Sequence, residues 1–298
     1  MTTHPLYGLG LATLGALILT PDVLLMRLSG LDGLSMLAWR GTALGLTFWA
    51  IWLLTARRPL ALAPLATRAG ITVILCQTAN AALFALGVSL APAAVVLLAV
   101  ATMPVWAAVL ARLLHGEATS RATWVAMAAV LAGIALAISG KGDLGIGPVA
   151  LLGALCGLGV AVTLGLSFVT LRHAPTLPLL PAMGTGALIS GLAGLTLAAP
   201  GAPTDGAILP ILATGLVILP ASFFCLSTAS RHTAASNVSL LMLLETVLGP
   251  LWVWLVLAEA PTPRMLAGGA VVVASLALYL AATRPRRRPL PAAPNIPG

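Results

Sequence analysis

Three charged side chains lie inside long apolar stretches of the chain, and their positions indicate where chemistry can occur. Asp22 and Arg40 fall in the first two stretches, and Glu245 falls near the middle of a later one. If these stretches cross a bilayer, an ionised group at its centre costs at least about 2.5–3.5 kcal/mol, which marks such residues as functional candidates. Each of the three is therefore a candidate for substrate binding, gating or proton binding.

Asp22 and Arg40 are predicted to form an ion pair. Asp22 lies near the outer end of the first stretch, and Arg40 lies about six residues into the second stretch from the same side. At about 1.5 Å of rise per residue, both lie roughly 9 Å below the outer surface. The pair would either fasten the two helices together or gate the outer side and present charge to a zwitterionic substrate.

Glu245 is predicted to lie near the middle of the membrane, with no basic residue at its depth. Polar side chains expected at a similar depth are Gln77, Asn80 and Ser222. One interpretation is a polar ring around a central cavity, in which Glu245 binds a proton or an amino group. The alternative is a hydrogen-bonded packing contact between helices.

Large apolar side chains near the same depth are candidate walls of a substrate cavity. These are Met103, Trp106 and Phe223, although a side chain of this kind in an apolar helix also packs in a core or against lipid. Prolines inside the stretches are candidate hinges, because membrane helices tolerate the kinks that proline produces. The four candidate hinges are Pro21, Pro104, Pro220 and Pro250.

The composition identifies an integral membrane protein. Apolar residues make up 60% of the 298, and only 7% are charged, against about 25% in soluble domains. The net charge of +8 would favour nucleic-acid binding in a soluble protein, but here the basic residues are spread over many loops. We therefore expect no nucleic-acid partner. The three cysteines are isolated in apolar stretches, so neither a disulfide framework nor a metal site is expected.

Apolar runs and the polar residues between them predict ten transmembrane helices in an all-α fold. A transmembrane helix needs roughly 20 apolar residues, and the chain length accommodates about ten of them. The predicted spans are Leu6–Arg27, Leu34–Leu54, Gly70–Leu90, Ala93–Leu114, Thr123–Ser139, Gly147–Leu171, Leu179–Ala199, Ile208–Ala229, Ala235–Ala258 and Arg264–Ala282.

The distribution of basic residues between short loops predicts the orientation. With the N-terminus in the cytoplasm, eleven Lys and Arg residues fall inside and three fall outside, which follows the positive-inside rule. The inside residues are Arg57, Arg58, Arg68, Arg112, Arg121, Arg172, Arg231, Arg284, Arg286, Arg287 and Arg288. Both termini are therefore predicted to be cytoplasmic in a multi-pass protein of the bacterial inner membrane.

A displacement of 142 residues reveals an internal repeat. It places Gln77–Ser139 over Leu219–Ala281 and Glu117-Ala118 over Glu259-Ala260, a match that is informative because acids are scarce here. Five spans per repeat is an odd number, so the two halves must cross the membrane in opposite senses. Inverted repeats with a central site are typical of secondary transporters. The predicted units are a first repeat over residues 1–142, an inverted second repeat over 143–283 and a basic, proline-rich cytoplasmic tail over 284–298.

Several short segments carry a resemblance to a known family. They are Ala38-Trp39-Arg40, the run from Leu86 to Ala94, Met103-Pro104-Val105-Trp106 with His115-Gly116-Glu117, and Leu244-Glu245-Thr246-Val247 with Ala258-Glu259. Together they resemble the EamA type of the drug/metabolite transporter superfamily, with Thr246 where a proline is usual. The resemblance implies ten helices and export of amino acids, other metabolites or drugs. The branch it suggests is that of bacterial aromatic and neutral amino-acid exporters.

The sequence thus predicts a secondary transporter that works by alternating access, with no cofactor and no metal. Its partners would be a small-molecule substrate, the lipid bilayer and, as an open alternative, a proton. Whether it acts as a monomer or a homo-oligomer is open. The only lysine, Lys141, is not part of a Walker A loop, and all four histidines lie at span ends or in loops. An exporter of drugs or other metabolites remains one alternative, and a membrane-embedded enzyme or lipid-handling protein remains another.

Overall fold

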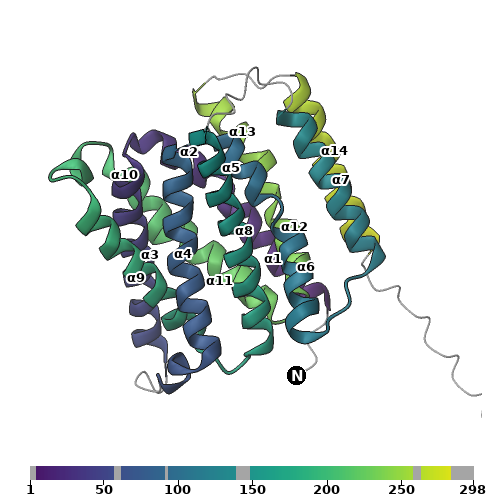
Figure 1. Cartoon of the computed structure of the whole chain (residues 1–298), viewed down its shortest axis with the longest axis horizontal. Coiled ribbons are helices and arrows are strands. Elements are labelled where there is room, and N and C mark those ends of the chain that lie inside the picture. The colour runs from purple at the N-terminus through teal and green to yellow at the C-terminus, as the bar shows by residue number, and fades with distance from the viewer. Residues whose placement is uncertain (1–4, 57–61, 91–92, 139–147, 258–262, 283–298) are drawn as a thin grey trace, which may run out of the picture.

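The computed structural model describes residues 5–56, 62–90, 93–138, 148–257 and 263–282. Every regular element in these ranges is a helix (Figure 1). Helices suit an apolar chain in lipid, because each backbone N–H and C=O is satisfied within its own segment. Several positions used above lie outside the described residues: Arg57, Arg58, Ala91, Pro92, Lys141, Glu259 and the tail over 284–298.

The helices follow the predicted spans closely. The first half contains α1 (Pro5–Leu19), α2 (Asp22–Ser29), α3 (Gly33–Thr55), a 3₁₀ turn η1 (Ala63–Ala66), α4 (Arg68–Leu90), α5 (Ala93–Val100), α6 (Met103–His115) and α7 (Arg121–Ile138). The second half contains α8 (Pro148–His173), α9 (Leu179–Leu197), a 3₁₀ turn η2 (Ala202–Thr204), α10 (Ile208–Ala213), a π-helical segment η3 (Thr214–Ile218), α11 (Leu219–Ser230), α12 (Ala235–Met242), α13 (Leu244–Leu257) and α14 (Pro263–Ala282).

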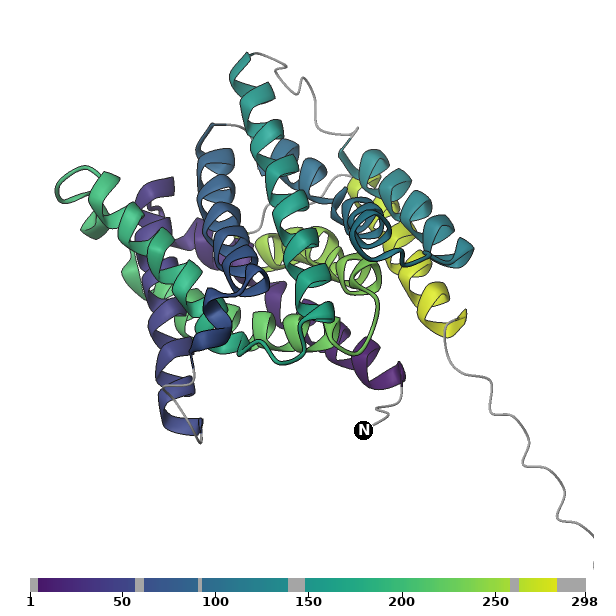
Figure 2. The ribbon, with the colours of Figure 1, turned by 60° about the horizontal axis from the view of Figure 1, so that its bottom comes forward.

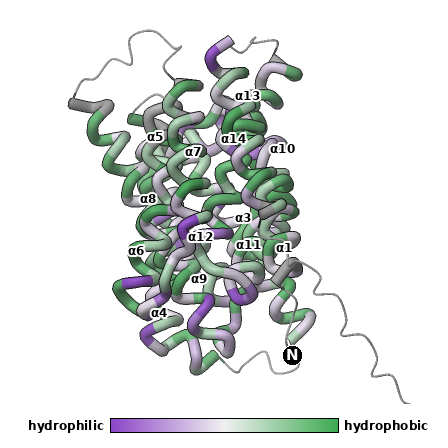
Figure 3. Tube along the Cα trace, turned by 90° about the vertical axis from the view of Figure 1, so that its right-hand side faces the viewer, coloured by the Kyte–Doolittle hydropathy of each residue, from purple (hydrophilic) through white to green (hydrophobic). Residues whose placement is uncertain are grey.

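Length and composition support ten crossings. Within the described residues, seven helices or consecutive helix pairs are long and apolar enough to span a bilayer. The remaining three predicted spans are occupied by shorter apolar helices, over Met103–His115, Arg121–Gly133 and Leu266–Tyr279. The strongly hydrophilic stretches lie mostly toward the two ends of the bundle (Figure 3). Large apolar side chains such as Leu54 and Leu209 are more than three-quarters exposed, as expected for a surface that contacts lipid.

Several predicted spans are interrupted rather than continuous. The first breaks at Thr20 and Pro21, the fourth at Ala101 and Thr102, and the ninth at Leu243, while the eighth passes through the π-helical segment. Such breaks leave backbone groups free at membrane depth, which is tolerated where the backbone lines a cavity or is covered by protein. A binding site is therefore expected beside these breaks.

The four candidate hinges do not share one setting. Pro21 directly precedes α2, Pro104 is the second residue of α6, and Pro220 is the second residue of α11, after the π-helical segment. Proline fits the first turn of a helix because its missing N–H needs no partner there. Pro250 lies inside α13, which continues through it without interruption.

The bounds of the helices show the same 142-residue displacement as the sequence. Moving α5 by 142 residues reproduces the bounds of α12, and moving α6 reproduces α13 to within one residue at its start. The break between α5 and α6 thus has its counterpart between α12 and α13. These parts of the two halves are built on one pattern of helices.

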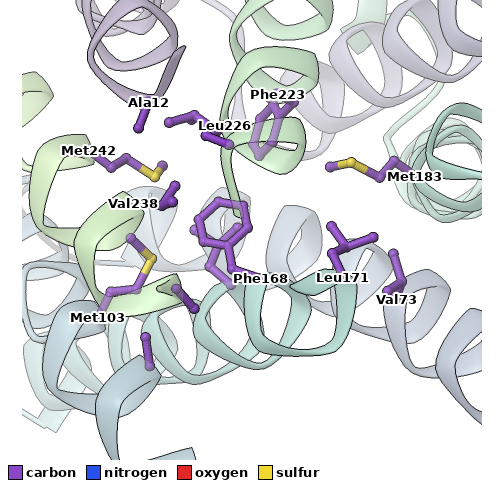
Figure 4. Packing of buried hydrophobic residues seen from close by; sticks show 14 of the residues in the cluster. Ala12, Val73, Met103, Phe168, Leu171, Met183, Phe223, Leu226, Val238 and Met242 are labelled. Carbon is purple, nitrogen blue, oxygen red and sulfur yellow. The ribbon is translucent and has the colours of Figure 1, made fainter. Parts of the chain in front are cut away.

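The helices form a bundle whose centre is flanked by two pairs. α3 packs along α9 on one side of the molecule, and α7 packs along α14 on the other (Figure 2). α3 and α9 approach so closely that a Cβ on Gly41 would lie 2.6 Å from the backbone nitrogen of Gly191. Only glycine fits there. Between the pairs, the core gathers Met103, Phe168 and Phe223 with Met242 from α6, α8, α11 and α12 (Figure 4).

Candidate substrate-binding cavity

The interrupted helices surround a cavity of about 420 Å³, within the range of about 300–1,000 Å³ usual for small-molecule sites. Both halves contribute to its lining, from α1 to α6 and from α8, α9, α11, α12 and α13. The lining includes the turn between α2 and α3, where the side chain of Asp32 is exposed. The cavity therefore communicates with the end of the bundle at which α2 turns into α3, and it reaches inward to the breaks in the fourth and ninth spans.

An ion pair between Asp22 and Arg40 forms part of the wall. Arg40 Nη2 donates to Asp22 Oδ2 at 2.8 Å, and the two side chains are only 15% and 3% exposed. Nη1 of Arg40 contacts the sulfur of Met26, and its guanidinium lies 5.9 Å from the centre of the Phe84 ring. Asp22 occupies the first turn of α2, where the helix dipole favours a negative charge. The break after α1 thus creates the helix start that positions the acid.

Glu245 lies beside this pair in the same cavity. It is the second residue of α13, immediately after the break at Leu243, and it is close enough to interact electrostatically with both Asp22 and Arg40. The expectation that no basic residue shares its depth is therefore wrong. Counting residues along straight spans separates Arg40 from Glu245, whereas the broken helices bring both side chains to one cavity.

Two amides on α4 complete the polar part of the lining. Gln77 is 3% exposed and Asn80 is 8% exposed. Within the described part of the chain, Gln77 Oε1, Asn80 Oδ1 and Asp22 Oδ1 are buried without a hydrogen-bond donor. Buried polar atoms nearly always have a partner, so these three oxygens are exceptions, and they give this wall of the cavity a partial negative charge.

The remaining predicted site residues divide into two groups. Met103 and Phe223 line the cavity, whereas Trp106 and Ser222 do not. The hydroxyl of Ser222 donates to the carbonyl of Gly15 at 2.9 Å and is fully buried between α11 and α1. Trp106 lies one turn beyond Met103 and is 37% exposed.

The sequence reasoning missed several lining residues. Asp32 carried a readable signal, because an aspartate directly before an apolar helical run is a typical N-cap. It accepts hydrogen bonds from the backbone of Leu34 and Ser35 and from the Ser35 hydroxyl. These bonds, the Ser35 hydroxyl above all, hold the pKa of the Asp32 carboxyl below its usual value. Met26 and Phe84 carried no comparable signal, since their roles depend on where Arg40 lies.

The opposite end of the bundle is joined by a second polar cluster. Arg172 Nε donates to Glu117 Oε1 at 2.7 Å, and His173 Nε2 lies 3.4 Å from the same oxygen. The rings of His115 and His173 stack with centroids 3.5 Å apart. These contacts connect the end of α6, in the first half, to the end of α8, in the second.

A protein of known structure shares this architecture. A crystal structure superposes with a TM-score of 0.78, covering 94% of this chain and 98% of the other, at 18% sequence identity. At that identity the likeness concerns the fold alone. No match was found among curated protein sequences. The sequence profile of the EamA-like transporter family matches twice, over residues 6–139 and 151–281, which are five spans each. With ten helical spans in two such segments, the chain belongs to the EamA-like transporter family, whose members are membrane transporters of small molecules.

Proposed function

We propose that this protein is a secondary transporter that exports neutral or aromatic amino acids, or similar small metabolites, across the bacterial inner membrane by alternating access. The cavity carries this proposal: it lies between two related halves and combines charged groups with apolar walls. We assign the halves to residues 1–142 and 143–283, and the segment 284–298 to a cytoplasmic tail.

Alternating access needs a site that is open at one end and closed at the other. The lining reaches the exposed Asp32 at the α2–α3 turn. At the far end, the Glu117–Arg172 ion pair and the stacked histidines tie the two halves together. Reversal of access would separate α6 from α8 there and close α2 and α3 over the cavity. The breaks in the first, fourth and ninth spans are natural points for such motion, because short helices can move relative to one another.

The chemistry of the cavity supports a small substrate with polar and apolar parts. Glu245, Gln77 and Asn80 offer polar atoms, while Met103 and Phe223 form apolar walls. An amino acid with an apolar side chain combines both parts in a molecule small enough for the cavity. A drug or another metabolite of similar chemistry is the second candidate within transport, and family membership supports it equally.

Flux measurements test the proposal. Purified protein in liposomes preloaded with an unlabelled amino acid should accumulate the same radiolabelled amino acid by exchange, and empty liposomes should not. A panel of neutral, aromatic, acidic and basic amino acids, with and without a pH gradient, would define the substrate class and any coupling to protons. Chemically altered product instead of exchanged substrate would indicate a membrane-embedded enzyme.

Orientation is tested separately. A reporter that is active only in the periplasm, fused after Gly298, should remain silent if the C-terminus is cytoplasmic. A strong periplasmic signal would contradict the ten-span topology with both termini inside.

A further inference from the structure

We infer that the cavity recognises its substrate by an ammonium group and does not require a carboxylate, so that its ligands are small amines with an apolar or aromatic body, amino acids included. The inference rests on the proposed function, since it takes this cavity as the transport site. Three observations carry it: the sign of the charge, the unpartnered oxygens, and the asymmetry of the walls.

The charged groups of the cavity leave an excess of negative charge. Its charged lining residues are Asp22, Asp32, Arg40 and Glu245. Arg40 is already engaged by Asp22 Oδ2 at 2.8 Å and by the sulfur of Met26. The acids outnumber the base whether or not Glu245 holds a proton. A cavity with apolar walls and an excess of one sign of charge concentrates ions of the opposite sign, so this one attracts cations.

Glu245 is the acid available to a ligand. Within the described residues, no hydrogen bond or ion pair of Glu245 with another residue satisfies the usual distance limits, and its side chain is partly exposed where it lines the cavity. A carboxylate accepts hydrogen bonds and donates none, whereas an ammonium group offers three donors. A substrate carboxylate at this position would instead face a like charge on ionised Glu245.

The buried oxygens favour the same ligand chemistry. Asp22 Oδ1, Gln77 Oε1 and Asn80 Oδ1 are buried and accept no hydrogen bond. The two amides are able to turn and present nitrogen instead, so they accommodate either kind of group. The Asp22 carboxylate has no such freedom. These oxygens are shielded from the cavity itself, but they add partial negative charge to its wall, which favours a positively charged ligand over an anion.

The two related sides of the cavity assign the ligand an orientation. Glu245 in α13 and Met103 in α6 are 142 residues apart and both line the cavity. Phe223 adds an aromatic wall from α11. The ammonium end would lie toward Glu245 and the two amides, and the apolar body would lie toward Met103 and Phe223.

Three related compounds distinguish recognition of an ammonium group from recognition of a carboxylate. 2-Phenylethylamine carries only the ammonium group, 3-phenylpropionate carries only the carboxylate, and L-phenylalanine carries both. A ligand that binds the folded state raises its thermal stability. With the purified full-length protein in detergent, we expect 2-phenylethylamine and L-phenylalanine to raise the melting temperature and 3-phenylpropionate to leave it unchanged. Stabilisation by 3-phenylpropionate without stabilisation by the amine, or by none of the three, overturns the inference.

Matched variants locate the interaction. Glu245→Gln keeps the shape of the side chain and removes its charge, and we expect it to weaken binding of 2-phenylethylamine by about tenfold or more, as for the loss of a hydrogen bond to a charged group. Asp205→Asn removes an acid from an exposed loop outside the cavity and should leave binding unchanged. Equal affinities for wild type and Glu245→Gln would contradict the inference. If Glu245→Gln does not fold, the three compounds on the wild type decide alone.

Flux in liposomes separates this inference from the proposed function. Exchange of L-phenylalanine by a protein that does not bind 2-phenylethylamine would overturn the ammonium rule and leave transport intact. Tight binding of 2-phenylethylamine without flux of any tested compound would support recognition of the ammonium group and contradict the proposed transport.

Discussion

The broken fourth span and the broken ninth span have the same helical layout but different chemistry. In both, a helix of eight residues is followed by an interruption and a longer helix, α5 with α6 and α12 with α13. At the same place after the break, α6 carries Met103 and α13 carries Glu245, and both residues line the cavity. The repeat thus places two side chains symmetrically, and only one of them is ionisable.

Another equivalent pair shows the same division. Gln77 corresponds to Leu219, and both line the cavity. In this pair the polar member belongs to the first half, whereas Glu245 belongs to the second. The repeated helices therefore determine where the walls lie, and single unmatched residues determine the charge. An asymmetric substrate needs this kind of asymmetry within a symmetric framework.

The largest effect is expected where an unmatched charge has a partner. Asp22→Leu removes the acid and leaves the Arg40 guanidinium without its carboxylate. Breaking a buried ion pair in this way costs about 3–5 kcal/mol. Arg40→Ala should be similarly harmful, and the double variant should recover part of the loss. The measurement is a double-mutant cycle on thermal unfolding of the purified protein. Additive losses would mean that the pair does not couple.

Glu245→Met makes the ninth break resemble the fourth in chemistry as well as in layout. We expect the protein to fold and its amino-acid exchange rate to fall by about tenfold or more, since the charge at the cavity is lost. Glu245→Gln should also transport more slowly, or lose any dependence of the flux on pH between 5 and 8. Exchange assays in liposomes across this range give the result. Wild-type flux at every pH in both variants would show that Glu245 has only a packing role.

A smaller effect is expected from making the backbone chemistry of the two breaks alike. Thr246→Pro introduces the residue found at the equivalent Pro104. The change removes the hydrogen bond from Thr246 N to the Leu243 carbonyl, of 3.1 Å, and the one from its hydroxyl. Each such bond contributes about 0.5–1.5 kcal/mol, and proline fits the first turn of a helix. Thermal unfolding should show a loss of this order, and a loss several times larger would show that the two breaks differ in backbone geometry.

The smallest effect concerns Asp32 at the mouth of the cavity. Asp32→Asn keeps the N-cap, because asparagine caps as well as aspartate, and removes a charge from the cavity mouth. Amine binding should weaken roughly twofold at low salt and less at high salt, because salt screens exposed charges. A titration series measured by thermal shift at two ionic strengths distinguishes this outcome from a loss of the cap.

The pH dependence of Asp32 has a definite sign. Because its folded pKa lies below the unfolded value of about 3.9, its hydrogen bonds stabilise the folded state above that value. The contribution is lost as the pH falls through the lower, folded pKa. Between pH 5 and 8 the carboxyl stays ionised, so Asp32→Asn should leave the shape of the flux profile in that range unchanged. A changed shape would assign the titrating group to the cavity mouth.

The sequence alone determined the features that depend on local transfer into lipid. The apolar composition, the ten spans and the 142-residue repeat were predictable because each apolar run is a property of its own residues. The scarcity of charge singled out Asp22, Arg40 and Glu245 for the same reason. The helix bounds agree with the predicted spans to within a few residues at the ends that the structure describes.

Only the tertiary structure decided which side chains meet. Whether a residue lines the cavity depends on the rotation of its helix and on where the helix breaks, and both follow from packing against other helices. The interruption at Leu243 places Glu245 beside Arg40, and the close approach of α1 to α11 engages Ser222 with the carbonyl of Gly15. Hydropathy gives no information on such rotations, because a helix has the same apolar content whichever face it turns inward.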